Sequence, residues 1–415
     1  MKRPVRYGWL PLILSLALVG AACGRNGQAT ARGQVKNRPA TPKTEAPPPA
    51  PVDPVATNEA MRKLWEQHVA WTRFYMVSAL AGLPDTQPRF EGMLRNQDDI
   101  GRAVKPFYGE EAGTQLTVLL RTHVTQAADL LKAARAGDQA ALSKAKQAWY
   151  ANADDIAAFL SRANPKNWPV DRIKPMLHTE LDQTIGETTN RLKGNYQAEI
   201  ADYDAVEDQI LKLADTLSSG IAAQFPDRFS PPSVPSSQLA FRNAMRKVWE
   251  EDVTWNHLFM VSALSGLPDA QPTAERLLRN QDDIGATVKP YYGDQAAAKL
   301  TQLLRTHIAQ EADLLKAAKA GDQTALGKAK DAWYASADDI AAFLSQTNPN
   351  YGSVDHLKAL WHADLDQTFA EVTNRLSGNH EAEIADQDIV EDQTLGIADT
   401  LSSGIVAQFP DRFAA

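Results

Sequence analysis

The 415-residue sequence contains a single cysteine, Cys23, and few of the motifs that identify enzymes. One cysteine excludes a disulfide within the chain, and it excludes zinc–thiolate and iron–sulfur sites that need several cysteine ligands. No Gly-x-Ser-x-Gly, P-loop or Gly-x-Gly-x-x-Gly pattern occurs. No Glu-x-x-His occurs either, which argues against a ferritin-like di-iron centre. These absences favour a binding or structural role over catalysis and leave an extracellular hydrolase as the least favoured alternative.

The chain also lacks a basic surface outside its first 56 residues. Residues 1–56 hold eight Lys/Arg and two Asp/Glu, a net charge of +6, whereas the remainder has a net charge of −14. An acidic body repels nucleic acid, and no basic, aromatic-rich stretch appears in it. We therefore expect no nucleic-acid partner. Acidity of this kind serves solubility or the binding of cations.

Residues 1–22 have the three parts of a secretory signal peptide. Lys2, Arg3 and Arg6 form a positive segment, Leu10–Val19 is apolar, and small residues precede Cys23. The apolar run is too short to span a bilayer comfortably. The small residues directly before Cys23 resemble a bacterial lipobox, with Gly20 where that motif usually has leucine. The resemblance implies cleavage before Cys23, acylation of its thiol and a lipid-anchored protein in the cell membrane that faces away from the cytoplasm.

Residues 23–56 are rich in proline, alanine, threonine and basic residues. Such a segment buries too little apolar surface to fold on its own, and its prolines favour an extended backbone. We expect a disordered stalk that follows the lipid anchor.

The rest of the sequence consists of two tandem copies of one module. Residues 60–229 align with residues 244–413 at a constant offset of 184, without an insertion or deletion, and the run Arg95–Gly101 returns unchanged as Arg279–Gly285. Each copy is long enough for its own hydrophobic core. The expected domains are a first repeat at 57–229, a Pro/Ser-rich linker at 230–240 and a second repeat at 241–415.

Apolar residues recur at spacings of three and four through each repeat, which predicts helices throughout. Gly82, Gly137 and Asn164-Pro165 mark helix ends, and Pro106 is expected to end another. The fold class predicted is all-α, with two tandem up-and-down antiparallel bundles of about six helices each. In the first repeat these helices are expected at about 58–82, 88–104, 110–136, 139–163, 171–192 and 196–224.

Several ionisable side chains fall among the apolar positions of these helices. In the first repeat they are Asp99, His123, His178, Asp182 and Glu207, and in the second Asp283, His307, His362, Asp366 and Glu391. Buried imidazoles and carboxylates on facing helices are typical of metal sites, so a divalent metal is the cofactor that this pattern allows. His68 is replaced by Asp252 in the second repeat, which exchanges one type of ligand for another. The alternative is a structural network in which these groups hydrogen-bond one another, and the sequence favours that alternative.

A set of short motifs stands out in the first repeat: Trp65, His68-Val69, Trp71-Thr72, Asn96-Gln97, Asp99-Ile100-Gly101, Tyr108-Gly109, Asn164-Pro165 and Gln224-Phe225-Pro226. These motifs resemble those of a family of small, single-module helical proteins from spore-forming and related bacteria. The resemblance covers both repeats, about 340 of the 415 residues, and implies a helical fold. That family has no established function, and its members often carry histidine near the position of Glu207, where this chain has glutamate.

Overall fold

The computed structural model describes residues 51–414, and this part of the chain is helical. The first repeat forms α1 (Pro54–Ala81), α2 (Thr86–Ala136), α3 (Gln139–Ala163), α4 (Val170–Leu192) and α5 (Tyr196–Gln224). The second forms α6 (Ser236–Ser265), α7 (Ala270–Ala320), α8 (Gln323–Thr347), α9 (Val354–Ser377) and α10 (His380–Gln408). None of these helices combines the length and apolar character needed to cross a lipid bilayer. The predicted signal peptide, Cys23 and nearly all of the predicted stalk lie outside the described residues.

Capping residues explain several of the helix boundaries. Asp53 precedes Pro54, and its side chain accepts from the backbone N–H of Val55 at 3.0 Å, so α1 begins four residues earlier than predicted. Asp138 caps α3 in the same way, directly after Gly137 has ended α2 in a left-handed conformation with φ of 67°. The second repeat begins its first helix at Ser236, inside the segment predicted to be linker.

The prediction of six helices per repeat differs from the structure at one place. The two helices expected at 88–104 and 110–136 are joined across a kink within α2, and the first of them continues past Pro106 instead of ending before it. The backbone leaves helical geometry only at Gly109, whose φ of 86° and ψ of 171° form a sharp kink. This combination is accessible essentially to glycine alone, so Gly109 rather than Pro106 decides where the chain turns. Gly293 makes the equivalent kink in α7.

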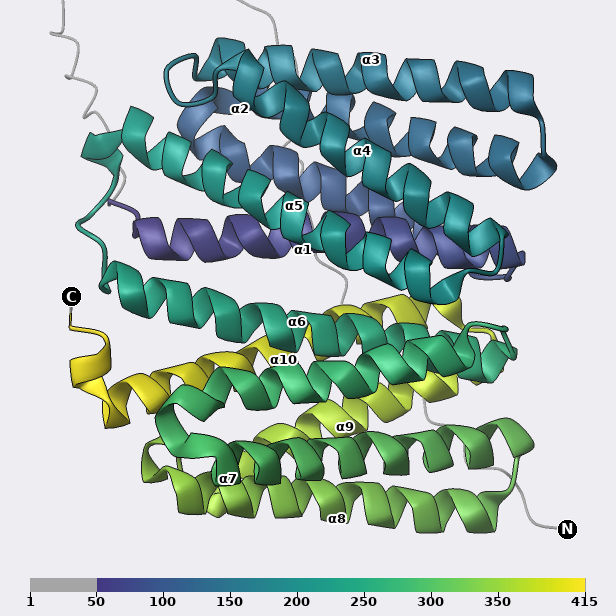
Figure 1. The fold of residues 1–415 in the computed structure, drawn as a ribbon, viewed down its shortest axis with the longest axis vertical. Helices are drawn as coiled ribbons and strands as arrows, with labels where there is room; N and C mark the ends of the chain where they lie inside the picture. Colours follow the sequence, from purple (N-terminus) through teal and green to yellow (C-terminus); the bar gives the residue numbers. More distant parts are fainter. Residues whose placement is uncertain (1–50, 415) are drawn as a thin grey trace, which may run out of the picture. The chain divides into compact units, whose positions relative to one another are not determined.

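Helices that follow one another in the sequence contact one another within each repeat. α1 contacts α2 and α5, and contacts also join α2 to α3, α3 to α4 and α4 to α5. The same pattern holds for α6–α10, drawn in green to yellow in Figure 1. Each repeat buries tryptophans in its core, including Trp65 and Trp149 in the first and Trp249 and Trp333 in the second. Burial of such large side chains stabilises each repeat without disulfides.

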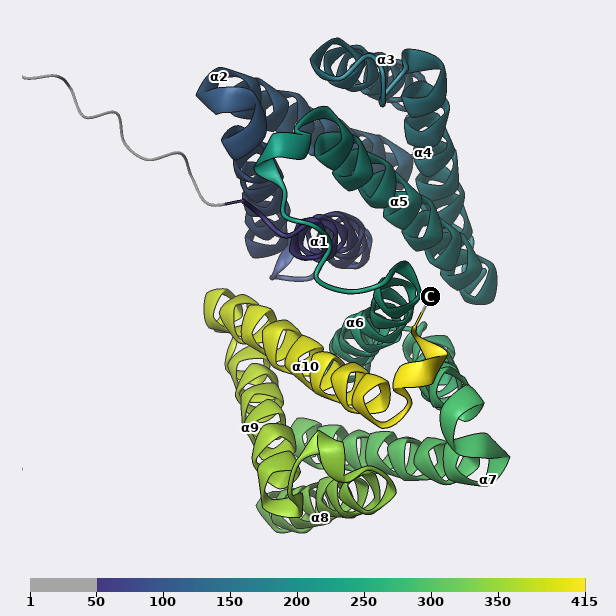
Figure 2. The ribbon, with the colours of Figure 1, turned by 90° about the vertical axis from the view of Figure 1, so that its left-hand side faces the viewer.

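The two repeats also contact each other. α1 lies against α6, α2 against α10 and α5 against α7 (Figure 2). The second and third contacts are equivalent with the two repeats exchanged, because α2 corresponds to α7 and α10 corresponds to α5. This exchange of roles is the mark of an approximate two-fold relationship between the repeats.

Candidate functional site

Two histidines and a glutamate from three helices meet in the core of the first repeat. His68 lies on α1, His123 on α2 and Glu180 on α4, and the three side chains are buried. Each has apolar neighbours on its own helix, such as Trp65 on α1 and Leu120 on α2, and the periodicity that buries those neighbours also turns the polar side chain inward. The fold therefore holds three ionisable groups together in the core.

The three groups are close enough to share one ion. One ligand atom from each lies within 4.8 Å of the others, and His123 Nε2 is 3.9 Å from Glu180 Oε2. In a tetrahedral zinc site with bonds of 2.0–2.2 Å, ligand atoms are about 3.4 Å apart. Small side-chain rotations therefore suffice to bring the three atoms to bonding distance. Two imidazoles and a carboxylate suit zinc, iron, copper or nickel.

Neighbouring amides fix the tautomers of both histidines. His68 Nδ1 is 3.1 Å from Gln97 Oε1, and the Gln97 amide nitrogen donates elsewhere, to the carbonyl of Met93 and to Asn96 Oδ1. The amide oxygen is thus the acceptor, so His68 carries its proton on Nδ1 and leaves a lone pair on Nε2.

The same logic applies to the second histidine. His123 Nδ1 is 2.8 Å from Asn152 Oδ1, and Asn152 Nδ2 donates to the carbonyl of Leu119 at 3.2 Å. His123 Nε2 is therefore the unprotonated nitrogen, and it is the nitrogen that faces Glu180. Outer partners that orient metal-ligating histidines in this way are the usual companions of a metal site.

Burial keeps His68 neutral at physiological pH. Loss of solvent and the neighbouring His123 lower the pKa of His68 to about 4, although Glu180 and Gln97 act in the opposite direction. A neutral imidazole is the form that binds a metal, so no proton has to be removed from His68 before ligation at pH 7.

The second repeat places a different set of side chains at the same positions. Asp252 occupies the position equivalent to His68, Asp364 that of Glu180 and Ser336 that of Asn152. His307 is equivalent to His123, so the histidine is retained at that position. His307 Nδ1 is 2.7 Å from Ser336 Oγ, and its ring stacks on Trp333. Asp252, His307 and Asp364 are not among the compact groups of possible metal ligands within residues 51–414. The second repeat is therefore an internal control for the first.

Of the ten ligands predicted from sequence, only His123 belongs to a compact group of three or more possible ligands within residues 51–414. His178 Nε2 is 2.7 Å from Asp154 Oδ1, partly exposed, and the exposed Asp182 accepts from the Tyr150 hydroxyl. Asp99 is partly exposed and pairs with Arg102 at 2.6 Å.

The remaining predicted ligands are also placed apart from one another. His362 pairs with Asp338 at 2.9 Å, Asp366 accepts from Tyr334, and Asp283 is exposed. Glu207 and Glu391 are buried where the repeats meet, Glu207 3.3 Å from Lys247 and Glu391 2.8 Å from Gln67. The ten residues thus form pairs and contacts between repeats rather than one site.

The ten predicted ligands include neither His68 nor Glu180, although the exchange of His68 for Asp252 between the repeats was noted as a change of ligand type. A usable signal was present in the exchange between repeats, because His68/Asp252 and Glu180/Asp364 both change identity while staying potential ligands. The prediction instead paired His178 with Asp182 through their spacing of four. The structure turns that face of α4 toward α3 and solvent, and turns Glu180 inward.

Two other compact groups of ionisable residues occur in the described part, Asp85/His380/Glu383 and His257/Glu371/Glu383. Arg89 and Arg375 already contact Glu383, and Arg375 contacts Asp85 at 2.9 Å. These arginines supply the positive charge that a metal would bring, so the first-repeat group is the better metal site.

The hydrolase alternative requires a cleft with two available carboxylates. A groove of about 410 Å³ between α2 and α3 contains Asp129 and Asp138. Asp138 accepts from the backbone N–H groups of Ala140 and Ala141 as the cap of α3, so this groove offers a single carboxylate that is free of a structural role.

Comparison of the whole chain with protein-family models, with curated proteins and with solved structures gives no match.

Proposed function

We propose that this protein is a membrane-anchored, extracytoplasmic lipoprotein that acts as a binding module, built from two tandem helical bundles on a stalk. Its first bundle binds one divalent transition-metal ion through His68, His123 and Glu180. The contacts of α1–α5 with one another, and of α6–α10 with one another, support the tandem arrangement. The sequence motifs further suggest that the chain arose by duplication within the single-module helical family that it resembles.

One observation carries the metal proposal. Both histidines use Nδ1 to donate to an amide oxygen, and His123 turns its free Nε2 toward Glu180 Oε2 at 3.9 Å. A network that served only packing would not need to turn an unprotonated nitrogen toward a buried carboxylate, because two groups that can only accept do not hydrogen-bond each other.

The test is the metal content of the full chain, purified without a histidine tag and analysed by mass spectrometry after dialysis. We expect about one equivalent of zinc, iron, copper or nickel. His68→Ala and His123→Ala should each abolish retention of the metal, whereas His307→Ala, the matched change in the second repeat, should leave it unchanged.

Thermal unfolding of metal-stripped protein provides an independent readout. Added metal should raise the melting temperature of the wild type and of His307→Ala, since a ligand that binds only the folded state stabilises it. If no metal copurifies and none of the four ions shifts the melting temperature, then His68, His123 and Glu180 are a structural polar network and the metal proposal is wrong.

The lipoprotein part of the proposal is tested separately. Cys23→Ser should move the protein from the membrane fraction to the soluble fraction and abolish incorporation of a labelled fatty acid. Retention of Cys23→Ser in the membrane would contradict anchoring through this residue, without bearing on the metal site.

A further inference from the structure

Ion pairs between the repeats occur twice, with the roles of the repeats exchanged. Arg191 Nη2 of the first repeat lies 2.7 Å from Asp269 Oδ2 of the second. At an offset of 184, Arg375 Nη1 of the second repeat lies 2.9 Å from Asp85 Oδ2 of the first. Further exchanged pairs are Arg95–Asp388 with Arg279–Asp204, and Lys63–Glu391 with Lys247–Glu207. Contacts of this kind are those of a two-fold dimer formed within one chain.

The contact between the repeats has two equivalent ends, one around Arg191 and one around Arg375. We call the end around Arg191 the first end, and it also contains Arg73. Arg73 Nη1 is 2.5 Å from Glu187 Oε1, and both guanidinium Nη atoms contact Glu199, at 3.0 and 3.1 Å. Arg191 Nη1 is 3.3 Å from Glu199 Oε1. Arg73 and the three acidic residues, Glu187, Glu199 and Asp269, are buried.

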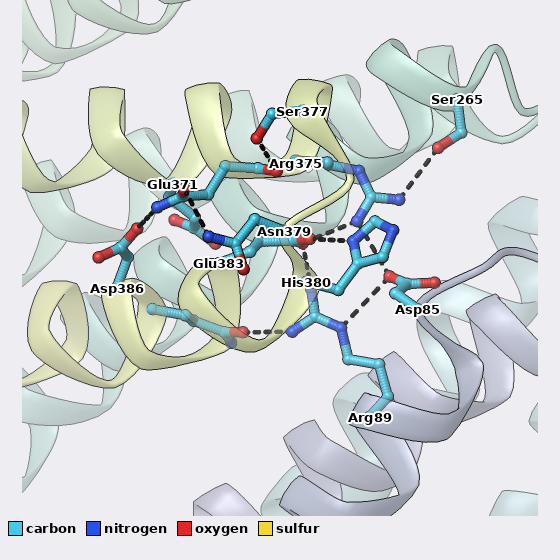
Figure 3. Close-up of polar contacts among 12 residues, drawn as sticks. Asp85, Arg89, Ser265, Glu371, Arg375, Ser377, Asn379, His380, Glu383 and Asp386 are labelled. Carbon is cyan, nitrogen blue, oxygen red and sulfur yellow. Dashed lines mark hydrogen bonds and ion pairs between the residues drawn. The ribbon is translucent and has the colours of Figure 1, made fainter.

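The opposite end, around Arg375, has the same three acidic positions, Glu371, Glu383 and Asp85, and we call it the second end (Figure 3). Arg375 Nη1 contacts Glu383 Oε1 at 2.7 Å as well as Asp85. Figure 3 shows Arg89 reaching from α2 to this cluster, where it contacts Glu383 and, through Nε, Asp85 at 3.4 Å.

The two ends differ in which repeat supplies the additional arginine. At the first end Arg73 comes from the same repeat as Glu187 and Glu199, and the other repeat contributes the buried Thr273. At the second end the position of Arg73 is occupied by His257, 2.5 Å from Glu371, and Arg89 comes across from the other repeat at the position of Thr273. Each end therefore has one arginine in addition to Arg191 or Arg375.

A third position, occupied by Tyr203 in the first repeat and Gln387 in the second, changes together with the Arg73/His257 and Arg89/Thr273 positions. Tyr203 packs against the guanidinium of Arg73, 4.7 Å from its ring centroid. Its counterpart Gln387 instead accepts from Arg89 Nη1 at 2.6 Å. The side chain at this position thus fits the arginine that is present at its end, whichever repeat supplies it.

Burial raises the pKa of Glu187 to about 8, and it raises the pKa of Glu371 well above the ordinary range, which favours the neutral form of one glutamate at each end. The other two acidic residues of each end then face two arginines. At the second end His380 also contacts Glu383, at 2.8 Å. A contact between two first repeats would place Arg73 and Arg89 at the same end, and a contact between two second repeats would place neither there.

We infer that this surface selects an unlike repeat as its partner: the first repeat fits the second repeat and rejects a copy of itself. One arginine too many leaves a buried positive charge without a partner, and one too few leaves a buried carboxylate without a partner. Either condition is strongly unfavourable in a buried cluster. The chain satisfies the unlike contact within itself, so this surface favours pairing inside one molecule over pairing between molecules. The inference does not depend on the metal site.

The test compares variants of the full chain in thermal unfolding. His257→Arg/Thr273→Arg/Gln387→Tyr gives the second repeat the residues of the first, and Arg73→His/Arg89→Thr/Tyr203→Gln makes the opposite change. Each creates a like pair, and we expect each to lower the melting temperature by at least about 5 °C. Combining all six substitutions exchanges the two sets and restores an unlike pair, so the combined variant should recover more than half of the summed loss.

Arg95→Thr is the matched control, because it removes an exposed α2 arginine that pairs with Asp388 across the same contact. It should change the melting temperature by no more than about 1 °C. The inference is overturned if the two triple variants are as stable as the wild type, or if the combined variant loses the sum of their effects. Additive losses would mean that the three positions act independently within each repeat.

Discussion

His123 Nε2 lies 3.9 Å from Glu180 Oε2 across the core of the first repeat, although 57 positions separate the two residues in the sequence. α2 and α4 bring them together, and α1 adds His68 to the group. The residues around this group differ from those at the equivalent positions of the second repeat. Matched substitutions in the two repeats should therefore have different effects.

The first prediction concerns Asn152, which accepts from His123 Nδ1. Asn152→Ala removes the acceptor that fixes the tautomer of His123, and we expect metal affinity to fall about 10- to 100-fold. Ser336→Ala is the matched change beside His307 and should leave metal affinity unchanged. Competition with a chromophoric chelator measures both. Equal affinity for wild type and Asn152→Ala would show that Asn152 does not orient a metal ligand.

The second prediction concerns pH and Glu311 of α7. Burial raises the pKa of Glu311 to about 8, a hydrogen bond from Asn256 acts in the opposite direction, and Asp252 and Asp364 raise the pKa further. Because the pKa is higher in the folded state than the unfolded value of about 4.5, the stabilising effect of this group is fully present below pH 4.5 and is lost as the pH rises through 8.

Glu311→Gln should therefore flatten the fall in unfolding free energy between pH 5 and 8 and make the protein more stable than wild type at pH 8. Asn256 Nδ2 can still donate to the new amide oxygen, as it donates to Glu311 Oε2 at 2.6 Å. Urea unfolding across this pH range measures the effect, with the exposed Asp313→Asn on the same helix as control. A wild-type slope that persists in Glu311→Gln would exclude Glu311 as its source.

The third prediction concerns Gly101, the last residue of the repeated run. A Cβ at Gly101 would lie 2.8 Å from the carbonyl oxygen of Gly113 and 1.9 Å from Thr117 Oγ1. A Cβ at Gly285 would meet Thr301 equally closely but would stay 3.3 Å from the carbonyl of Ala297. A threonine side chain can rotate, whereas a helix backbone must shift.

We therefore expect Gly101→Ala to lower the free energy of unfolding by about 1–3 kcal/mol and Gly285→Ala to lower it by less. Chemical denaturation of the two single variants gives the comparison. A larger loss for Gly285→Ala would indicate that the threonine, rather than the backbone, sets the cost.

The fourth prediction separates conformational strain from crowding at Gly109. No atom lies within 4 Å of a Cβ built at Gly109 or at Gly137, so steric contact is not at issue at either position. Gly109 has φ 86° and ψ 171°, which only glycine adopts readily, whereas Gly137 has the left-handed conformation that asparagine also tolerates.

Gly109→Asn should destabilise the protein by about 1–3 kcal/mol, and Gly137→Asn should cost clearly less. Urea unfolding midpoints of the two variants check this difference. Equal losses would mean that the kink at Gly109 relaxes to an ordinary left-handed turn when its residue is changed.

The helical segments can be recognised from the sequence alone. Periodic apolar residues, Asp138 as a cap, and Gly82 and Gly137 as helix ends all act within a few residues of one another. Such local effects can be recognised without a structure. The same holds for the duplication, for the burial of His123, and for the motifs that predict a lipid anchor at Cys23. The break inside α2 was predicted at the wrong residue because proline weakens a helix locally, whereas the turn needed the glycine three residues later.

Which polar residues meet depends on how the helices pack against one another. Glu180 and His178 lie two positions apart on α4, yet one joins the buried histidines and the other faces Asp154 near the surface. A helical period specifies a face of α4, but the partners of that face depend on how α1, α2 and α3 pack around it. The exchange of Arg73 for Arg89 between the two ends depends in the same way on the contact between repeats, because the guanidinium groups reach the same acidic positions from different helices.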